Sequence, residues 1–233
     1  MNLFDKLHMQ LRFRRYRQRK EAAEIAFMQS LPLGGRTVID IGANKGVYCY
    51  WLSKAVGRDG RVIAFEPQPE LEAHLADVID SFSLANVELT PFALSAQAGD
   101  TMLYRRAAGA GDASFEAMPG GEGITVRCTT LDDYATLTGL EDVAFIKCDV
   151  EGHELAVMQG AEHLLRHCAP ILQVECHHRE AAQGELFAFL SGLGYEGFFI
   201  QDGRHIPCGE FDRYPCRKPT LDHRNYLFLP ASA

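Results

Sequence analysis

The chain has 233 residues, 47% of them hydrophobic, which is enough to bury a full core and most simply forms one domain. Its formal charge of −8 excludes a general polyanion binder. No apolar run approaches the ~18 residues of a membrane span, and the N-terminus lacks a signal-type apolar core. The seven cysteines form no CxxC pair, so we expect reduced thiols and a cytoplasmic location.

The first 20 residues differ in charge from the rest of the chain. They hold seven basic residues and one acid, Asp5, for a net charge of +6, which leaves −14 for the remainder. Leu3, Leu7 and Leu11 recur every four residues, which predicts an amphipathic helix. Two interpretations stay open. The helix docks on an anionic surface, such as a membrane or a carrier-borne substrate, or it packs on the domain with a solvated charged face.

A strand–helix alternation follows this basic helix. We expect a helical extension over residues 1–36, ended by Pro32 and Gly34, and a main domain over 37–233. The pattern predicts strands at 37–41, 61–67, 87–94, 143–150, 171–176, 197–201 and 225–230, and helices at 47–56, 70–83, 154–167 and 180–193. This order indicates an α/β fold with a doubly wound, seven-stranded, mostly parallel sheet and an antiparallel pair at its C-terminal edge.

Two short strand-like segments interrupt the alternation. Residues 101–106 and 124–129 flank a loop at 107–123 that is rich in glycine and alanine. We predict an inserted antiparallel β-hairpin whose mobile loop covers the acceptor pocket of an enzyme.

A glycine-containing bend follows the first predicted strand, in "VIDIGANKGVYCYW". Gly42 and Gly46 permit a sharp turn at the carboxyl end of the sheet, where ligands of such folds bind. Glu66 ends the second strand, 20 residues after Gly46, as expected of a carboxylate that accepts both ribose hydroxyls. The turn has one glycine fewer than a dinucleotide site, and its Asp40 and Asn44 suit an amino-acid tail better than a diphosphate. The spacing favours S-adenosylmethionine over NAD; a purely structural turn is the alternative.

A second polar cluster follows the strand at 143–150. Asp149, Glu151 and His153 have D-x-E-x-H spacing, so they converge if the chain stays extended. We expect Asp149 near the sulfonium and the cofactor tail, and Glu151 or His153 as a general base. Helix capping is the alternative for the two acids, and surface packing is the alternative for His153.

The next strand ends in further polar residues. Glu175, His177 and His178 leave the sheet at the same edge, and we expect Glu175 above all to contact substrate or act as base. A divalent metal is chemically possible with the donors Asp149, Glu151, His153, Glu175 and His177, but it is not expected. A zinc site is less expected still, with the donors His205, Cys208, Cys216 and His223.

The motifs together resemble the FkbM family of S-adenosylmethionine-dependent methyltransferases from about residue 37 to 228. They are "TVIDIGANKGVY", "VIAFEPQPE", "VELTPFALSAQAGD", "TTLDDY", "VAFIKCDVEGHELAVMQGA", "ILQVEC" and "NYLF". The block "IKCDVEGHELAVMQGA" is the most specific. The resemblance implies a Rossmann-like class I methyltransferase sheet and methyl transfer, usually to oxygen. It does not extend to residues 1–36.

The resemblance also implies the cofactor contacts. They are Asp40, Gly42, Ala43, Asn44, Gly46, Tyr48, Glu66, Pro67, Ala93, Leu94, Ser95 and Asp149. In this scheme the turn holds the methionine end, Glu66 takes the ribose, Pro67 shapes the loop behind it, and residues 92–95 lie along the adenine.

Three classes of function are compatible with these features. The leading one is an O-methyltransferase whose acceptor is a sugar or secondary metabolite, free or carrier-bound. A nucleic-acid, N- or carboxyl-methyltransferase that docks through the basic N-terminus is the second. The charge of −14 beyond residue 20 and "CDVE" in place of an N/D-P-P-Y/F tetrapeptide disfavour a nucleic-acid partner. The third is a non-catalytic scaffold, which the acids at Asp149 and Glu151 disfavour.

Overall fold

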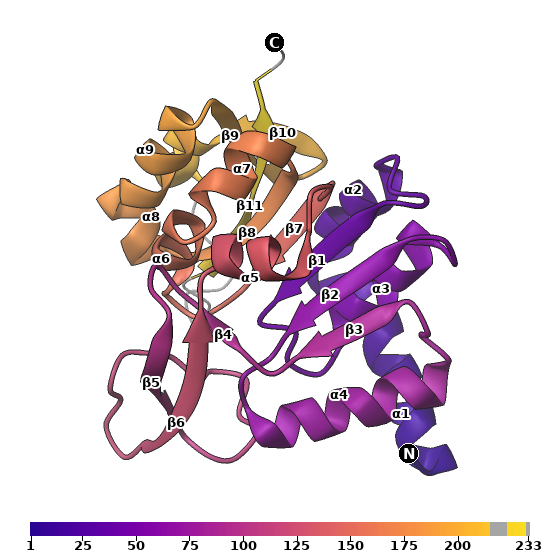
Figure 1. Cartoon of the computed structure of the whole chain (residues 1–233). Helices are drawn as coiled ribbons and strands as arrows, with labels where there is room; N and C mark the ends of the chain where they lie inside the picture. The colour runs from indigo at the N-terminus through magenta and orange to yellow at the C-terminus, as the bar shows by residue number, and fades with distance from the viewer. Residues whose placement is uncertain (215–222, 232–233) are drawn as a thin grey trace.

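A mixed eight-stranded sheet in the order β10-β9-β11-β8-β7-β1-β2-β3 forms the centre of the molecule (Figure 1). The computed structural model describes residues 1–214 and 223–231. The strands are β1 (Thr37–Ile41), β2 (Arg61–Phe65), β3 (Val87–Thr90), β7 (Phe145–Cys148), β8 (Ile171–His177), β9 (Tyr195–Gln201), β10 (Arg204–Pro207) and β11 (His223–Pro230). Strands β3, β2, β1, β7 and β8 pair in parallel, whereas the pairs β8–β11, β11–β9 and β9–β10 are antiparallel. The predicted α/β class with a mostly parallel sheet is confirmed.

The prediction of seven strands is wrong by one, because a hairpin adds β10. Asp202 and Gly203 both have positive φ, 49° and 75°, and Arg204 pairs with Gln201 across them. Two central residues with positive φ form the hairpin turn that Asp-Gly favours. As a result β10 is the edge strand, and β11 lies between β8 and β9.

A smaller three-stranded sheet, β4-β6-β5, lies beyond the carboxyl ends of the central strands. It consists of β4 (Ala93–Leu94), β5 (Gly99–Arg105) and β6 (Glu122–Thr129). Strands β5 and β6 are antiparallel, with Leu103 opposite Ile124, so the predicted hairpin is confirmed. The predicted strand at 87–94 is divided at Pro91, which lacks the N–H that would continue the ladder.

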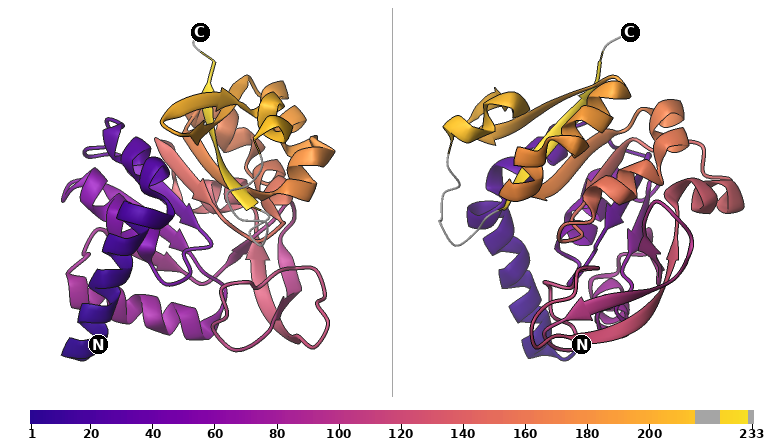
Figure 2. Two further views of the ribbon diagram at one scale, coloured as in Figure 1. Left: turned by 180° about the vertical axis from the view of Figure 1, so that it is seen from behind. Right: turned by 90° about the vertical axis from the view of Figure 1, so that its left-hand side faces the viewer.

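Helices cover both faces of the central sheet (Figure 2). They are α1 (Leu3–Arg15), continued by a π-helical turn (Tyr16–Lys20), α2 (Ala22–Ser30), α3 (Val47–Val56), α4 (Pro69–Phe82), α5 (Leu131–Thr138), α6 (Glu154–Gln159), α7 (Glu162–Cys168), α8 (His178–Gln183), α9 (Glu185–Gly192) and a 3-10 helix (Cys208–Arg213). Because side chains alternate along a strand, Val38 packs with α1 to α4, whereas Ile39 packs with α5 to α9.

Two predicted long helices are each divided in two. Gly160 separates α6 from α7, and a Cβ there would lie 2.0 Å from the carbonyl oxygen of Ser95. Gly184 has φ +74° and separates α8 from α9.

The N-terminal helix packs on the domain, but not through its row of leucines. Phe13 is buried and stacks on Tyr50 of α3 at 4.2 Å between ring centroids, and Trp51 Nε1 donates to Phe13 O at 3.3 Å. Leu7 and Leu11 instead lie exposed on the opposite side. Within the described residues, no helix has the length and apolar character needed to cross a lipid bilayer.

Candidate active site

The bend between β1 and α3 depends on two glycines. Gly42 has φ +77°, and a Cβ at this position would lie 2.0 Å from the carbonyl oxygen of Asp149. Gly46 also has φ +77°, and its Cβ would lie 2.8 Å from Cδ2 of Leu75 in α4. The first glycine lets the end of β1 lie directly against the end of β7, and the second lets α3 begin close to α4.

Glu66 lies at the end of β2 and faces this bend. Its carboxylate accepts the backbone N–H of Asn44 at 2.9 Å and that of Gln68 at 3.0 Å. Burial raises the pKa of Glu66 to about 7, although both hydrogen bonds act to lower it. Asn44 Oδ1 is buried as well, and within the described residues no donor reaches it. Two acceptors are therefore placed at the bend for a ligand with donor groups.

A cleft that is partly open to solvent lies between the bend and the end of β7. It is lined by Ile41, Gly42, Asn44, Phe65, Glu66, Pro67, Gln68, Phe92, Ala93, Leu94, Leu103, Gly111, Ala113, Phe115, Asp149, Val150 and Glu151. One wall is apolar and aromatic, and polar side chains stand at both ends.

The loop between β5 and β6 contacts both ends of the cleft. Gln68 Nε2 donates to Ala110 O at 3.0 Å on the side of Glu66. On the opposite side, Ser114 Oγ donates to the carbonyl oxygen of Glu151 at 3.0 Å. The loop thus forms one wall of the cleft, and Phe115 adds an aromatic ring to it.

A buried lysine organises the acidic end of the cleft. Lys147 lies on β7 and is 1% exposed, with its Nζ 3.6 Å from Asp149 Oδ2 and 3.6 Å from Glu175 Oε2. Burial lowers the pKa of Lys147, but the two carboxylates outweigh burial and hold it above its usual value. Lys147 therefore stays charged and draws the two acids together.

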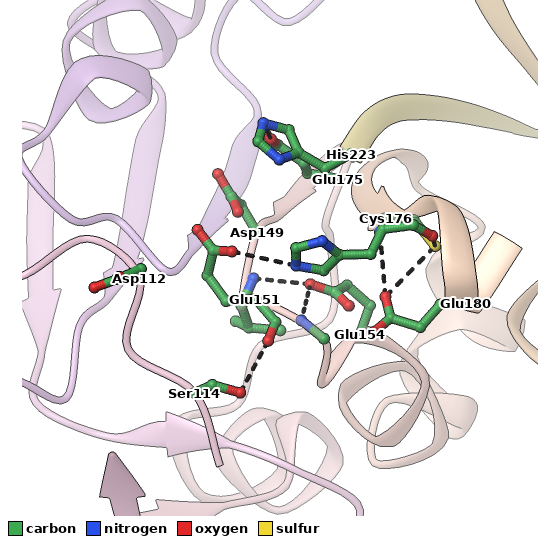
Figure 3. A network of polar contacts seen from close by, with 12 residues as sticks. Asp112, Ser114, Asp149, Glu151, Glu154, Glu175, Cys176, Glu180 and His223 are labelled. Carbon is green, nitrogen blue, oxygen red and sulfur yellow. Dashed lines mark hydrogen bonds and ion pairs between the residues drawn. The ribbon is translucent and has the colours of Figure 1, made fainter. Parts of the chain in front are cut away.

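The two acids that share Lys147 have different environments. His223 Nε2 lies 2.9 Å from Glu175 Oε1. Burial raises the pKa of Glu175, but His223 and Lys147 together bring it down to about 2. Burial also raises the pKa of Asp149, and the charges of Glu175 and Glu151 add to this rise against the opposing charge of Lys147. Of these two acids, Asp149 is therefore the one with a raised pKa, and it lines the cleft. Figure 3 shows it beside Glu151.

Glu151 lies beside Asp149 and is held by a histidine (Figure 3). Glu151 Oε2 is 3.3 Å from His177 Nε2, and this contact raises the pKa of His177 to about 9. Glu154 Oε1 accepts the N–H of Val150 at 3.1 Å and that of Gly152 at 3.2 Å, which fixes the backbone on both sides of Glu151. His177 is thus protonated at neutral pH and does not have the form of a base.

The structure separates His153 from the two acids. Glu151 and Gly152 have φ +53° and +98°, so the chain is not extended after Asp149 and the side chains do not alternate as the spacing predicted. His153 Nε2 lies 2.8 Å from Ser95 Oγ, and burial lowers its pKa. His153 therefore belongs to the side of the site formed by Ser95 and the hairpin loop.

Several residues predicted to contact the cofactor lie behind the cleft. Cys49 Sγ donates to Asp40 Oδ2 at 3.1 Å, and burial raises the pKa of Asp40 to about 6. The Tyr48 hydroxyl donates to Glu21 at 2.5 Å and accepts from Gln173 Nε2 at 2.5 Å. Within the predicted set, the residues that line the cleft are Gly42, Asn44, Glu66, Pro67, Ala93, Leu94 and Asp149, together with Glu151 from the catalytic candidates. Ala43, Gly46, Ser95 and Glu175 lie outside the lining.

Sequence reasoning missed Lys147, Gln68 and Phe115, and it considered His223 only as a zinc donor and not as a partner of Glu175. A lysine inside the apolar strand "VAFIKC" was a usable indication, because a buried cation requires acidic partners. His223 carried no comparable indication. It reaches Glu175 only because β11 pairs with β8, where His223 lies opposite His177.

Metal ligation has little geometric basis in the described part of the chain. Among residues 1–214 and 223–231, no group of three or more His, Cys, Asp or Glu side chains is arranged to hold a metal ion. The zinc arrangement considered from sequence includes Cys216, which lies outside the described residues. His178, the remaining second-line candidate, lies against Phe211 at 5.3 Å between ring centroids.

Comparison with solved structures shows the same fold at low identity. Methyltransferase FkbM from Methylobacillus flagellatus has a TM-score of 0.58 and 17% identity, over 86% of this chain and 45% of that chain. Aeropyrum pernix fibrillarin with bound S-adenosyl-L-methionine has a TM-score of 0.52 and 12% identity, over 89% and 74%. A SAM-dependent O-methyltransferase from Thermotoga maritima has a TM-score of 0.50 and 14% identity, over 92% and 66%. The chain thus spans less than half of the first of these proteins.

A family model identifies the chain more specifically than these structural similarities do. No curated protein sequence matches the chain. The model of the Methyltransferase FkbM domain matches residues 40–196, which is more than half of the chain and includes both the glycine bend and the acidic cluster. The chain belongs to the FkbM methyltransferase family.

Proposed function

We propose that the protein is an S-adenosylmethionine-dependent O-methyltransferase that acts on a hydroxyl group of a small molecule, a sugar or a secondary metabolite. One observation carries this proposal. Asp149, a partly exposed carboxyl with a raised pKa, lines the same cleft as Asn44 and Glu66. A proton acceptor for a hydroxyl therefore adjoins a cradle for a nucleoside with an amino-acid tail.

The residues at the bend fit the cofactor. Ribose hydroxyls are donors, and Glu66 is a buried carboxylate at the end of the second strand, where such hydroxyls are accepted. Asn44 Oδ1 lacks a donor within the described residues and suits the ammonium group of a methionine tail. Phe92, Leu94 and Phe115 supply the apolar wall that an adenine ring requires.

The acidic end of the cleft performs the proton transfer. S-adenosylmethionine supplies an electrophilic methyl group when it is bound. The chain holds the acceptor hydroxyl in line with that methyl group, and positioning of this kind is worth up to ~7–11 kcal/mol. As the new carbon–oxygen bond forms and the sulfur–carbon bond breaks, Asp149 takes the hydroxyl proton. Lys147 keeps Asp149 in place and Glu175 sets its proton affinity, so these two are positioning residues.

The hairpin loop excludes water from this reaction. Its hydrogen bonds to Gln68 and to the backbone of Glu151 hold it across both ends of the cleft. Opening the loop would admit the acceptor and release the methylated product.

Methyl transfer to an unknown acceptor is tested with isotope-labelled S-adenosylmethionine. Small-molecule extracts are incubated with the protein and with Asp149→Asn, and mass spectrometry is used to find compounds that gain one labelled methyl group. We expect such a compound with the wild type and at least a hundredfold less of it with the variant. The absence of any labelled small molecule would contradict the proposed acceptor, and equal labelling by both proteins would contradict the role of Asp149.

A further inference from the structure

The outer side of α1 exposes apolar side chains that the domain does not use. Leu3, Phe4, Leu7 and Leu11 are 76%, 78%, 51% and 63% exposed. These four are most of the large hydrophobic side chains that the described residues expose. At 100° per residue they fall within about a third of the helix circumference, opposite the side that is buried on the domain.

This apolar face is presented by a well-anchored helix. The buried Phe13 stacks on Tyr50 and meets Phe82 edge to face at 5.2 Å, while Lys6 Nζ lies 5.4 Å from the Phe82 ring centroid. The Asn2 side chain caps the first turn by accepting the N–H of Asp5 at 2.9 Å. The exposed face therefore belongs to an ordered, capped helix and not to a frayed end.

Basic side chains border the same face. On a helical projection, Arg14 falls within the arc of the leucines, one turn beyond Leu11, and Arg15 falls just outside that arc; both are exposed. Arg17, Arg19 and Lys20 follow in the π-helical turn, with Arg17 over the Trp51 ring at 4.9 Å. Within the described residues, none of these five forms an ion pair with a carboxylate. Their charge is available to an anionic partner.

We propose that the outer face of α1 docks the protein on an anionic lipid surface. The four apolar side chains enter the boundary between headgroups and acyl chains, and the bordering arginines contact the headgroups. Stable docking of this kind takes two contributions, apolar burial and a basic patch, and both are present here.

A lipid surface suits this face better than a protein groove. One side of α1 is already packed on its own domain, so only the outer side of the helix is free to bind a partner. A lipid surface can deform around such a convex side. Residues 21–233 carry a net charge of −14, so anionic lipid would repel the other sides of the molecule. In both views of Figure 2, the N-terminal end of α1 lies at the same end of the molecule as the hairpin of β5 and β6.

Vesicle co-sedimentation tests the proposal, and it does not depend on methyl transfer. The whole chain is mixed with phosphatidylcholine vesicles, or with vesicles in which about 30 mol % is phosphatidylglycerol. We expect binding to the anionic vesicles only, weakened by salt. Leu7→Gln/Leu11→Gln should weaken binding at least about tenfold, and each of Arg14→Gln and Arg15→Gln about fivefold.

The control is Leu137→Gln, which removes an 86% exposed leucine from α5 and should leave binding unchanged. Thermal unfolding midpoints equal to that of the wild type establish that the variants fold.

The proposal is overturned by no vesicle binding, by equal binding to neutral and anionic vesicles, or by an equal loss of binding in the control Leu137→Gln. It is also overturned if polyglutamate binds the wild type and the double variant Leu7→Gln/Leu11→Gln equally well, which would indicate an acidic protein partner. Self-association that this double variant abolishes, without vesicle binding, would indicate a second copy of the chain.

Discussion

The two ends of the cleft are built in different ways. The cofactor end comes from one continuous stretch, in which β1, the glycine bend and β2 place Asn44 and Glu66 together. The acidic end joins residues far apart in the chain, since Lys147, Glu175 and His223 come from β7, β8 and β11. The first is determined by local backbone conformation, and the second by long-range strand pairing and charge balance. Substitutions at the acidic end should therefore affect mainly turnover, and substitutions at the glycine bend should affect mainly folding.

The largest expected effect is on turnover at the acidic end. Asp149→Asn keeps the shape of the side chain but cannot take the hydroxyl proton, so we expect kcat to fall by about 10²–10⁴-fold. The affinity for S-adenosylhomocysteine should change little. Asp133→Asn, at an exposed acid of α5, is the matched control and should retain full activity. Loss of cofactor affinity in Asp149→Asn would remove the distinction between the two ends.

The next effect is on folding at the cofactor end. In Gly42→Ala the new Cβ would meet the Asp149 carbonyl oxygen at 2.0 Å and would also strain the positive φ. We expect the free energy of unfolding to fall by about 3 kcal/mol or more in urea denaturation. Gly35→Ala has nearly the same φ, +75°, but no atom within 4 Å of the new Cβ, so it should cost only about 1–2 kcal/mol. Equal costs would show that the close approach to β7 is unimportant.

A moderate effect concerns pH and cofactor affinity. Burial raises the pKa of Glu66 to about 7, and the ionised form is the better acceptor for ribose hydroxyls. The affinity for S-adenosylhomocysteine should therefore rise about tenfold between about pH 6 and pH 8, as this carboxyl ionises. Glu66→Gln should bind more weakly and show a flat profile over that range. A parallel rise in the variant would assign the titration to another group.

The smallest effect should be a displaced pH profile. Glu175→Gln removes a negative charge beside Asp149 and removes one of the acids that share Lys147, so the pKa of Asp149 should fall. The acidic limb of kcat/KM then moves to lower pH, because Asp149 is ionised at lower pH in the variant. Glu116→Gln, on the exposed part of the hairpin loop, should leave the profile in place. A shift to higher pH would contradict the charge balance described here.

The sequence predicts the cofactor end well for a physical reason. Gly42, Gly46 and Glu66 act through local geometry, and α3 has the predicted bounds because Gly46 and Gly57 end it on both sides. Two local indications were present but missed, namely the Asp202-Gly203 hairpin and the helix α5, whose first turn Thr130 caps by accepting the N–H of Asp133 at 2.9 Å.

Other features could not be predicted from local sequence. The pairing of His223 with Glu175 depends on the place of β11 in the sheet, between β8 and β9. The sequence also does not show that Leu7 faces outward, because α1 has apolar residues on two sides. Packing of Phe13 against Tyr50 decides which side is buried.

Isothermal titration with S-adenosylhomocysteine tests whether the cleft binds the cofactor and whether Glu66 holds it. We expect heat of binding with the wild type and with Asp149→Asn at similar affinity, and at least about tenfold weaker binding with Glu66→Gln. No heat with this ligand or with S-adenosylmethionine, together with clear binding of a nicotinamide dinucleotide, would contradict the account.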